Sequence, residues 1–374
     1  MFKVSHTHSV AQFYYYYTQN KLAHGNIYIH SETWYHELMD LLIDTYGTFI
    51  GSTGERLVLY LPSKTKKRIR KEYPIRRIEK IVILRPSSIS THAVKLALEH
   101  EVDIVYLGAF GKPVGRVLGS DSRGIATTRR AQLEMSTNPT HALYLAKSFV
   151  TGKCKNQITY LKYLMAKYDA DFEKEITQSE TLLQTIENIP VGEKAREQLF
   201  GVEGYIADKY WRCLKQLYKF PGRIPQGRDK FNSALNYGYG ILYNEVERAC
   251  LYIGLDPYLG LYHAERYGKP ALVLDMVEEL RVPIVDSAIV PLFVEKKLGK
   301  LKDFEKVGGN EYQLSAEGKA KVVEAVFEHL SRKVKWRGKQ RTLKSIIEIQ
   351  SQTLARYFLE KEKAYTPFDF ALLL

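Results

Sequence analysis

A segment that contains an apolar run interrupted by carboxylates places the tightest constraint on how this chain can fold. It runs from Gly254 to Asp286 and reads GLDPYLGLYHAERYGKPALVLDMVEELRVPIVD. Its part ALVLDMVEEL has the composition of a buried helix, yet it contains Asp275, Glu278 and Glu279. Buried helices accept carboxylates only where something compensates their charge.

Two interpretations of these carboxylates stay open. Asp275 and Glu278 lie three positions apart, which places them on one side of a helix. A metal ion bound on that side would compensate both charges. Alternatively, both residues mark the solvated side of an ordinary amphipathic helix, a common arrangement that the spacing alone favours.

Length and composition predict a folded chain of two domains in a reducing compartment. The chain has 374 residues, which is too long for a single core of ordinary size, so two domains are expected. Its hydrophobic content of 45% is typical of a folded protein. Three scattered cysteines form no CxxC pair, so a cytoplasmic location is expected and structural zinc is not. No apolar run approaches the roughly 18 residues that span a bilayer, and the N-terminus lacks the apolar core of a signal peptide. We therefore expect no membrane association.

The pattern of apolar residues predicts an α+β protein, with an N-terminal β-rich domain followed by a larger, all-helical domain. Residues 44–122 contain short β-branched and aromatic runs separated by glycine-containing turns. One helix interrupts them at 91–100, with Ser90 or Thr91 as its N-cap. From residue 123 onward, apolar residues recur every three or four positions in long segments, and prolines fall between these segments.

Residues 1–43 differ from both domains and are expected to be an N-terminal extension, either disordered or the product of a misassigned start codon. They hold five of the ten histidines and an aromatic run from Phe13 to Tyr17. The spacing of these histidines fits no zinc pattern. Met39 opens a segment that reads like a natural domain start.

Positive charge is concentrated in two windows. The net charge is +13, and residues 64–85 carry ten basic and two acidic residues while 332–344 carry seven basic and none acidic. Clustering of this kind favours contact with nucleic-acid phosphates, although two solvated loops are the alternative. Trp336, inside the second window, is a candidate for stacking on a base.

Three features together point to a metal site. They are His263, the side of the helix that carries Asp275 and Glu278, and Glu203, which lies among apolar residues in the helical segment AREQLFGVEGYIADKYWRCL. One histidine and carboxylates from separate helices suit Mg²⁺ or Mn²⁺. Taken singly, a lone histidine is more often a hydrogen-bonded structural residue. P-loop, GxSxG, HExxH and GxGxxG motifs are missing, so ATP use, serine hydrolysis and nicotinamide binding have no support.

Several moderately specific motifs occur in one order along both predicted domains. They include ERLVLYLP, YPIRRIEKIVIL, GKPVGRVLG, RRAQ at 129–132, GKCKNQ at 152–157, LFGVEGYIADKYW, RDKFNSALNYGYGILYNEV, GLDPYLGLYH and LVLDMVEELR. Through them, from Tyr46 to Phe368, the chain resembles the CRISPR-associated endonuclease that acts as the spacer-acquisition integrase, the first of the numbered CRISPR-associated proteins. The head before residue 44 has no counterpart in this resemblance.

The resemblance implies a metal site formed by a glutamate, a histidine and a second acidic residue. Motif by motif, these fall on Glu203, His263 and Glu278, with Asp275 as an accessory acidic group. All three ligand positions are occupied by the expected residue types, which predicts an active enzyme that uses Mg²⁺ or Mn²⁺. Candidates for contact with the DNA backbone are Arg223, Arg228, Lys230, Arg248 and Arg266, of which the first three occupy or border a Pro/Gly loop before a long helix.

The same resemblance implies the reaction and the partners. A homodimer, formed through the β-rich domain, would work with the small ferredoxin-like second CRISPR-associated protein. It would join the 3′-hydroxyl ends of short double-stranded DNA fragments to a CRISPR repeat by transesterification, and cleave DNA in isolation. A general metal-dependent nuclease for branched DNA in repair, and a non-catalytic nucleic-acid-binding scaffold, are the alternatives.

Overall fold

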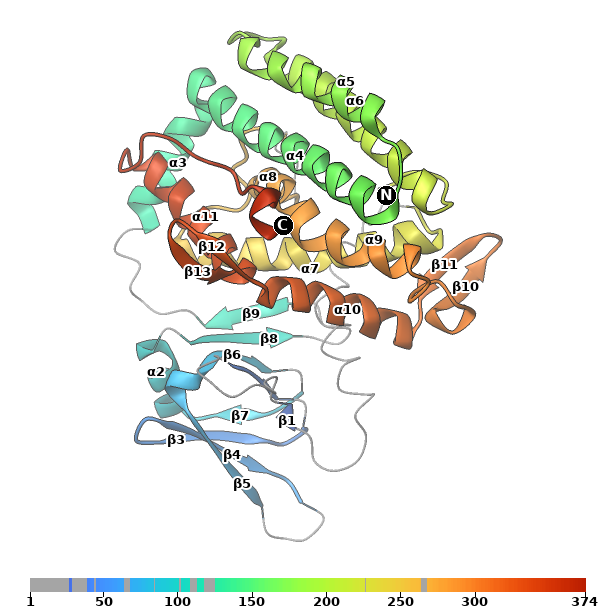
Figure 1. Cartoon of the computed structure of the whole chain (residues 1–374). Coiled ribbons are helices and arrows are strands. Elements are labelled where there is room, and N and C mark those ends of the chain that lie inside the picture. Colours follow the sequence, from blue (N-terminus) through green and yellow to red (C-terminus); the bar gives the residue numbers. More distant parts are fainter. Residues whose placement is uncertain are drawn as a thin grey trace. The chain divides into compact units, whose positions relative to one another are not determined.

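The structure of the chain is a computed structural model, in which two compact units, Met1–Ser122 and Arg123–Leu374, are each described by themselves. It describes residues 27–28, 39–43, 45–63, 68–83, 85–100, 102–107, 113–117, 125–225, 227–263 and 268–374. Figure 1 shows the element labels used from here on.

The first unit contains two β-sheets and one helix. A five-stranded sheet has the order β1-β2-β6-β8-β9, and a four-stranded sheet has the order β5-β4-β3-β7. The strands are β1 (Ile27–Tyr28), β2 (Met39–Ile43), β3 (Phe49–Thr53), β4 (Arg56–Leu61), β5 (Ile69–Pro74), β6 (Ile78–Ile83), β7 (Ser88–Ile89), β8 (Asp103–Leu107) and β9 (Pro113–Val117). Helix α2 (Thr91–Glu99) begins at Ser90, whose hydroxyl accepts a hydrogen bond from the amide of Ala93 and so confirms the expected cap.

Strand β2 shows that this unit begins before residue 44. It pairs in parallel with β6, and its residues Leu41 and Ile43 belong to a buried core that also contains Ile81 and Ile104. The predicted boundary at 43/44 therefore cuts off two strands of the five-stranded sheet, β1 and β2. The histidine-rich part of residues 1–38, apart from β1, lies outside the described residues.

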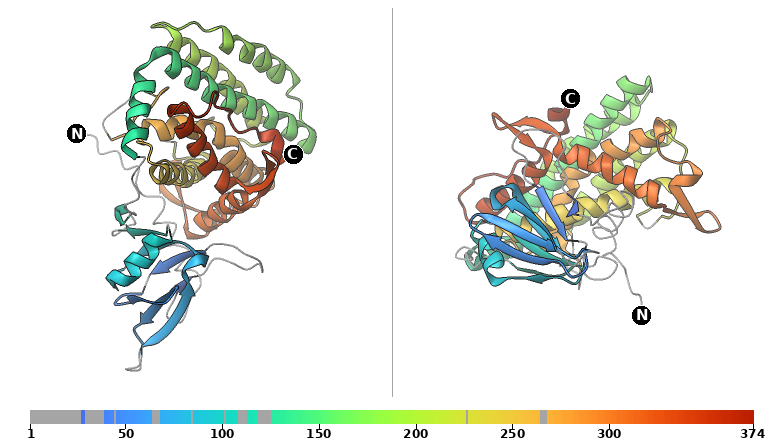
Figure 2. Two further views of the ribbon diagram at one scale, coloured as in Figure 1. Left: turned by 90° about the vertical axis from the view of Figure 1, so that its left-hand side faces the viewer. Right: turned by 90° about the horizontal axis from the view of Figure 1, so that it is seen from below.

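The second unit is built mainly from helices. They are α3 (Ile125–Thr137), α4 (Pro139–Tyr168), α5 (Glu173–Leu183), α6 (Ala195–Leu217), α7 (Lys230–Ile253), α8 (Ala271–Val277), α9 (Ser287–Val294), α10 (Ala316–Ser331) and α11 (Leu343–Phe358). Helices α5 and α6 form a hairpin that packs beside α4, as Figure 1 and the left view of Figure 2 show. None of the helices in the described residues is long and apolar enough to cross a bilayer.

Two β-hairpins make the prediction of an all-helical second unit wrong. They are formed by β10 (Phe304–Gly308) with β11 (Glu311–Leu314), and by β12 (Lys333–Trp336) with β13 (Lys339–Thr342). The turn of the second is Arg337-Gly338, and both residues have positive φ, at 47° and 78°. This is the backbone of a type I′ turn, which suits the twist of a two-stranded hairpin.

Both ends of helix α7, the long helix expected after the Pro/Gly loop, are fixed by local capping. The Asp229 side chain accepts hydrogen bonds from the amides of Phe231 and Asn232, and Gly254 ends the helix with φ of 86°. Gly238 inside the helix allows close packing, since a Cβ there would lie 2.6 Å from Cδ1 of Ile289.

The carboxylate-bearing segment bends instead of continuing as one regular helix. Helix α8 passes at Glu278 into a 3₁₀ turn, Glu278–Leu280, and then into a π-helical turn, Arg281–Asp286, before α9 starts. This segment packs against α4. The bend carries Glu278 and Arg281 to the side of α4 on which Lys153 lies, because the three side chains meet there.

Candidate functional site

Two glutamates from different helices meet at one ammonium group. Glu203 lies on α6 and Glu278 at the end of α8, and Nζ of Lys153 on α4 contacts both. The distance from Lys153 Nζ to Glu278 Oε2 is 2.6 Å, and Glu203 Oε1 also accepts a hydrogen bond from Nζ. Lys153 and Glu203 are 13% exposed and Glu278 is 2% exposed. The solvated-side interpretation of Glu278 is therefore wrong.

Further donors hold each glutamate in place. Tyr262 donates its hydroxyl to Oε2 of Glu203, and Arg281 donates to Oε1 of Glu278 at 2.9 Å. The Arg281 guanidinium lies 4.9 Å from the centroid of the Tyr239 ring, a cation–π contact. Among the described residues, no regular hydrogen bond reaches Glu278 Oε2, so Lys153 balances this oxygen mainly by charge.

The electrostatics favour ionised partners in spite of burial. Burial alone would raise the pKa of Glu278, but Arg281 and Lys153 outweigh it and lower that pKa to about 2. Burial alone would lower the pKa of Lys153, but Glu278 and Glu203 outweigh it and raise that pKa. Burial, followed by the charge of Glu203, raises the pKa of Tyr262, which keeps its hydroxyl a donor. At neutral pH, the cluster therefore holds two carboxylates and two cations.

Asp275 orients His263 through contacts with its backbone and its ring. Its carboxylate, which is fully buried, accepts hydrogen bonds from the backbone amides of Leu261 (2.6 Å), Tyr262 (3.0 Å) and His263 (2.8 Å). The same carboxylate contacts Nδ1 of His263 at 2.7 Å. Because an ionised carboxylate can only accept, Nδ1 carries the ring proton and Nε2 keeps its lone pair for a ligand. This is the arrangement of a metal-binding histidine and its supporting carboxylate.

The three predicted ligands occupy one neighbourhood without forming a closed metal site. Tyr262 connects them, since it follows Leu261 in the loop held by Asp275 and donates to Glu203. His263 also contributes to lowering the pKa of Glu278. Among the described residues, no three histidine, cysteine or acidic side chains are close enough to hold an ion together. The two glutamates nevertheless converge on one positive charge, so their oxygens fit a cation.

Two motifs of the sequence support this site from behind. Gln132, of RRAQ, is fully buried and holds the turn before His263. Its Nε2 donates to the carbonyls of Asp256 (2.9 Å) and Leu259 (3.0 Å), and its Oε1 accepts from the amide of Asp256 (2.8 Å). Asn156, of GKCKNQ, is also buried and donates to the carbonyl of Glu279 at 2.7 Å. These polar side chains replace backbone partners that irregular segments would otherwise lack.

The residues that sequence reasoning missed are Lys153, Tyr262 and Arg281. Lys153 lies within the motif GKCKNQ, between Gly152 and Cys154, which are both buried. A lysine in the middle of a buried helical stretch needs a partner, and this was the available signal. Arg281 follows Glu278 by three residues, a spacing that pairs charges on a helix.

Most of the predicted DNA-contact residues have partners within the chain. Arg223 donates to Asn232 at 2.9 Å, Lys230 donates to the carbonyl of Gly299 at 2.8 Å, and Arg248, 12% exposed, pairs with Glu348 at 2.9 Å.

Arg228 is exposed and pairs with Glu311 at 3.0 Å, so it alone of these four combines exposure with a surface ion pair. Arg266 lies outside the described residues. The prediction of DNA contact therefore rests most securely on other basic residues.

The β12–β13 hairpin presents such a basic surface. Along β12, Lys333 and Lys335 are exposed while Val334 and Trp336 are buried, and β13 exposes Lys339 and Arg341. Trp336 packs on Phe368 with ring centroids 5.3 Å apart. The expectation that Trp336 stacks on a base is therefore wrong, because strand alternation turns it inward.

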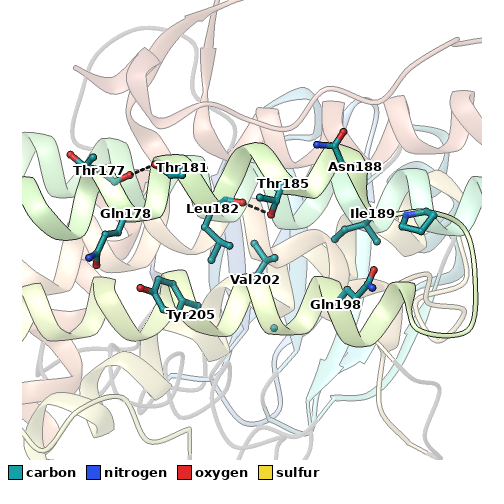
Figure 3. A pocket seen from close by; sticks show the side chains of 12 residues that line it. Thr177, Gln178, Thr181, Leu182, Thr185, Asn188, Ile189, Gln198, Val202 and Tyr205 are labelled. Carbon is teal, nitrogen blue, oxygen red and sulfur yellow. Dashed lines mark hydrogen bonds between the residues drawn. The ribbon is translucent and has the colours of Figure 1, made fainter.

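An open groove between α5 and α6 lies next to this site but does not include it. It has a volume of about 850 Å³, and its lining residues are uncharged. Figure 3 shows side chains of the two helices, such as Leu182 and Val202, facing one another across it. None of the three predicted ligands lines the groove. Its lining therefore offers no acidic group for a cation.

Comparisons with known proteins agree on one family. The family described as "CRISPR associated protein Cas1" matches residues 41–328. A protein named "CRISPR-associated endonuclease Cas1 1" from Archaeoglobus fulgidus is 30% identical over 351 residues, which cover 88% of this chain and 99% of the relative. A protein of the same name from Pyrobaculum aerophilum is 31% identical over 255 residues, 68% of this chain and 82% of the relative.

Two solved structures share the fold. One is described as "Casposase bound to integration product", with a TM-score of 0.62, 27% identity and coverage of 88% of this chain and 97% of that one. The other is a chain of a "Partial Cas6-RT-Cas1--Cas2 complex", with a TM-score of 0.66, 19% identity and coverage of 89% and 98%. At 19% identity, the second likeness concerns the fold alone.

Proposed function

Since the chain belongs to the Cas1 family of CRISPR-associated endonucleases, we propose that it is the metal-dependent integrase of CRISPR adaptation. It joins the 3′-hydroxyl ends of short double-stranded DNA fragments to a CRISPR repeat by transesterification, and it cleaves DNA by hydrolysis. The observation that carries this proposal is the convergence of two glutamates, the partly buried Glu203 and the buried Glu278, on one positive charge beside His263.

The donor set fits Mg²⁺ or Mn²⁺. Glu203 and Glu278 supply carboxylate oxygens and His263 supplies Nε2. The three described cysteines, of which Cys154 lies beside the site, are buried, and burial raises their pKa values to about 12, which keeps them protonated and poor metal ligands. Hard oxygen ligands with one imidazole suit these ions better than zinc. When bound, the ion would neutralise charge on the scissile phosphate and favour deprotonation of the attacking hydroxyl or water.

The chain's own residues prepare this chemistry. Asp275 fixes the ring of His263, and through three amide contacts it also fixes the loop on which that ring stands. Arg281 keeps Glu278 ionised in spite of its burial. Preorganised charge of this kind stabilises the transition state without reorganisation during the reaction.

The basic hairpin supplies affinity for the DNA backbone. Lys333, Lys335, Lys339 and Arg341 are exposed on two short strands that contain no acidic residue. Phosphate contacts of this kind position the duplex and do not depend on its sequence. Arg228 adds one exposed basic group at the start of α7, although it must exchange Glu311 for a phosphate.

The proposal includes partners. Family membership favours a homodimer that associates with the small ferredoxin-like second CRISPR-associated protein. The casposase relative, described as bound to an integration product, supports a strand-transfer reaction on DNA. If integration into a repeat-containing plasmid proceeds equally without the small partner, the protein is instead a nuclease for branched DNA.

Strand transfer by matched variants tests the proposal. We expect Glu203→Gln and His263→Ala to lose strand transfer and Mg²⁺- or Mn²⁺-dependent cleavage by at least about 10²-fold, while DNA affinity changes little. Lys155→Met is the control. Lys155 lies on the same helix as Lys153, but it is exposed and its ion pair is with Asp369, outside the site. Full activity in either variant, or activity that survives EDTA, removes the metal mechanism. DNA binding without any metal-dependent product would leave only a scaffold.

A further inference from the structure

Lys153 occupies the point where the two glutamates converge, and no step of the proposed reaction uses it. We propose that Lys153 couples metal binding to DNA binding. While DNA is absent, its ammonium group competes with the ion for the carboxylates. When the ion binds, the ammonium group forms an ion pair with a DNA phosphate instead. This inference rests on the proposed function of the same site.

The geometry leaves Lys153 little freedom except to exchange partners. Its ammonium contacts Glu203 and Glu278 at once, and its side chain is 13% exposed. The backbone of α4 cannot retreat here, because a Cβ on the preceding Gly152 would lie 2.5 Å from Cβ of Pro367 and 3.2 Å from Cβ of Glu279. An ion that takes the glutamate oxygens therefore displaces the ammonium and not the helix.

The charges of the site are balanced by an ion together with one phosphodiester. With the His263 ring neutral, as a metal ligand must be, three carboxylates, Glu203, Glu278 and Asp275, and two cations, Lys153 and Arg281, leave one net negative charge. A divalent ion alone turns this into one positive charge in a largely buried site. An ion and a phosphodiester together bring the sum to zero, which avoids an uncompensated buried charge.

The displaced ammonium has a use in this scheme. Without its carboxylate partners, it would be a nearly buried, unpaired cation, which is costly. A non-bridging oxygen of the phosphate is the acceptor that substrate brings to the site, and lysine is a common phosphate ligand. The ion and the DNA should therefore each raise the affinity for the other, by the same factor.

Binding of Mn²⁺ to the full-length protein tests this coupling directly. Free Mn²⁺ is counted by electron paramagnetic resonance, with and without a short DNA duplex whose 3′ ends are blocked by dideoxynucleotides. For the unmodified protein, we expect the duplex to tighten Mn²⁺ binding by at least about fivefold. For Lys153→Met, we expect Mn²⁺ binding without DNA to be at least about tenfold tighter, because the ammonium that contacts both glutamates is removed and a unit charge repels a nearby divalent ion even under water-like screening. In this variant the duplex should give no further gain.

Two further variants separate the possible results. Lys155→Met removes an exposed lysine two positions along α4 and should behave like the unmodified protein. Lys153→Arg keeps the positive charge, so it should keep the coupling, and it serves if Lys153→Met does not fold. Mn²⁺ binding to Lys153→Met that is unchanged or weaker, or an unmodified protein whose Mn²⁺ affinity ignores DNA, overturns the inference. If Glu203→Gln binds Mn²⁺ as the unmodified protein does, the proposed metal site itself is refuted, independently of Lys153.

Discussion

The carboxylate of Asp275 should be costly to alter, because it is fully buried and holds the loop that carries His263. It accepts four hydrogen bonds, two at Oδ1 from the amide and Nδ1 of His263, and two at Oδ2 from the amides of Leu261 and Tyr262. In Asp275→Asn, one oxygen remains and keeps two donors. The new amide group faces the other two donors and cannot accept from them.

The size of the effect follows from these contacts. Hydrogen bonds to a charged group contribute about 1.5–3 kcal/mol each, and a buried donor left without an acceptor costs about 1–3 kcal/mol. Losing two such bonds should therefore lower the free energy of unfolding by about 3–5 kcal/mol. That is a large share of the roughly 5–15 kcal/mol that a domain has, and it corresponds to a fall in Tm of about 10 °C for a unit of this size.

Urea unfolding of Asp275→Asn measures this loss. A lower midpoint with an unchanged m-value would report a change in stability alone. Asp256→Asn is the matched control, because Asp256 accepts a single exposed hydrogen bond, from the amide of Tyr258, and should cost less than about 1 kcal/mol. If Asp275→Asn unfolds within about 1 kcal/mol of the unmodified protein, the assignment of Asp275 as the residue that holds the His263 loop is refuted.

Three further predictions concern the surroundings of the site. Gln132→Ala leaves three backbone groups of the turn before His263 without partners, and urea unfolding should show a loss of about 2–4 kcal/mol; an unchanged midpoint would contradict this. Burial raises the pKa of Glu279 to about 7, although Tyr365 and two other donors oppose the rise. The folded protein therefore prefers Glu279 protonated. The free energy of unfolding, measured relative to Glu279→Gln, should be highest below about pH 4.5 and fall by about 3 kcal/mol as the pH rises to about 7. If the difference in unfolding free energy between the two proteins does not change over this range, the prediction is refuted. Replacing Lys335 and Arg341 by glutamine should weaken DNA binding for every sequence and reduce the salt slope by about 2, as measured by fluorescence anisotropy; an unchanged slope would show that the hairpin does not contact DNA.

The parts of the fold that could be predicted are those fixed by neighbouring residues. Helix α7 follows the Pro/Gly loop as expected, and its ends are set locally by the caps Asp229 and Gly254. The β12–β13 hairpin is not predicted, because its high basic content is equally typical of a solvated loop. Its signals are the alternation of basic residues with Val334 and Trp336 and the turn residues Arg337-Gly338.

The site could be predicted only in part, for a similar reason. Glu278 was identified as one member of an acidic helix face, but its burial depends on Arg281 and Lys153, and Lys153 lies 125 residues away in the sequence. Asp275 was expected to be accessory, and its contacts with the His263 loop depend on a turn that folds back over α8. Arg248, a predicted phosphate ligand, instead pairs with Glu348, which lies 100 residues away in the sequence. Periodicity reports which face a residue occupies, whereas partners from distant segments decide what it does there.

The central claim is that Glu203, His263 and Glu278 together hold one divalent ion that DNA cleavage requires. An anomalous difference map from crystals soaked in Mn²⁺, with DNA present, tests this most directly. We predict one strong peak within bonding distance of a carboxylate oxygen of Glu203, of Nε2 of His263 and of a carboxylate oxygen of Glu278, and its loss in Glu203→Gln. A peak elsewhere, or cleavage-competent crystals with no peak among these three residues, would contradict it.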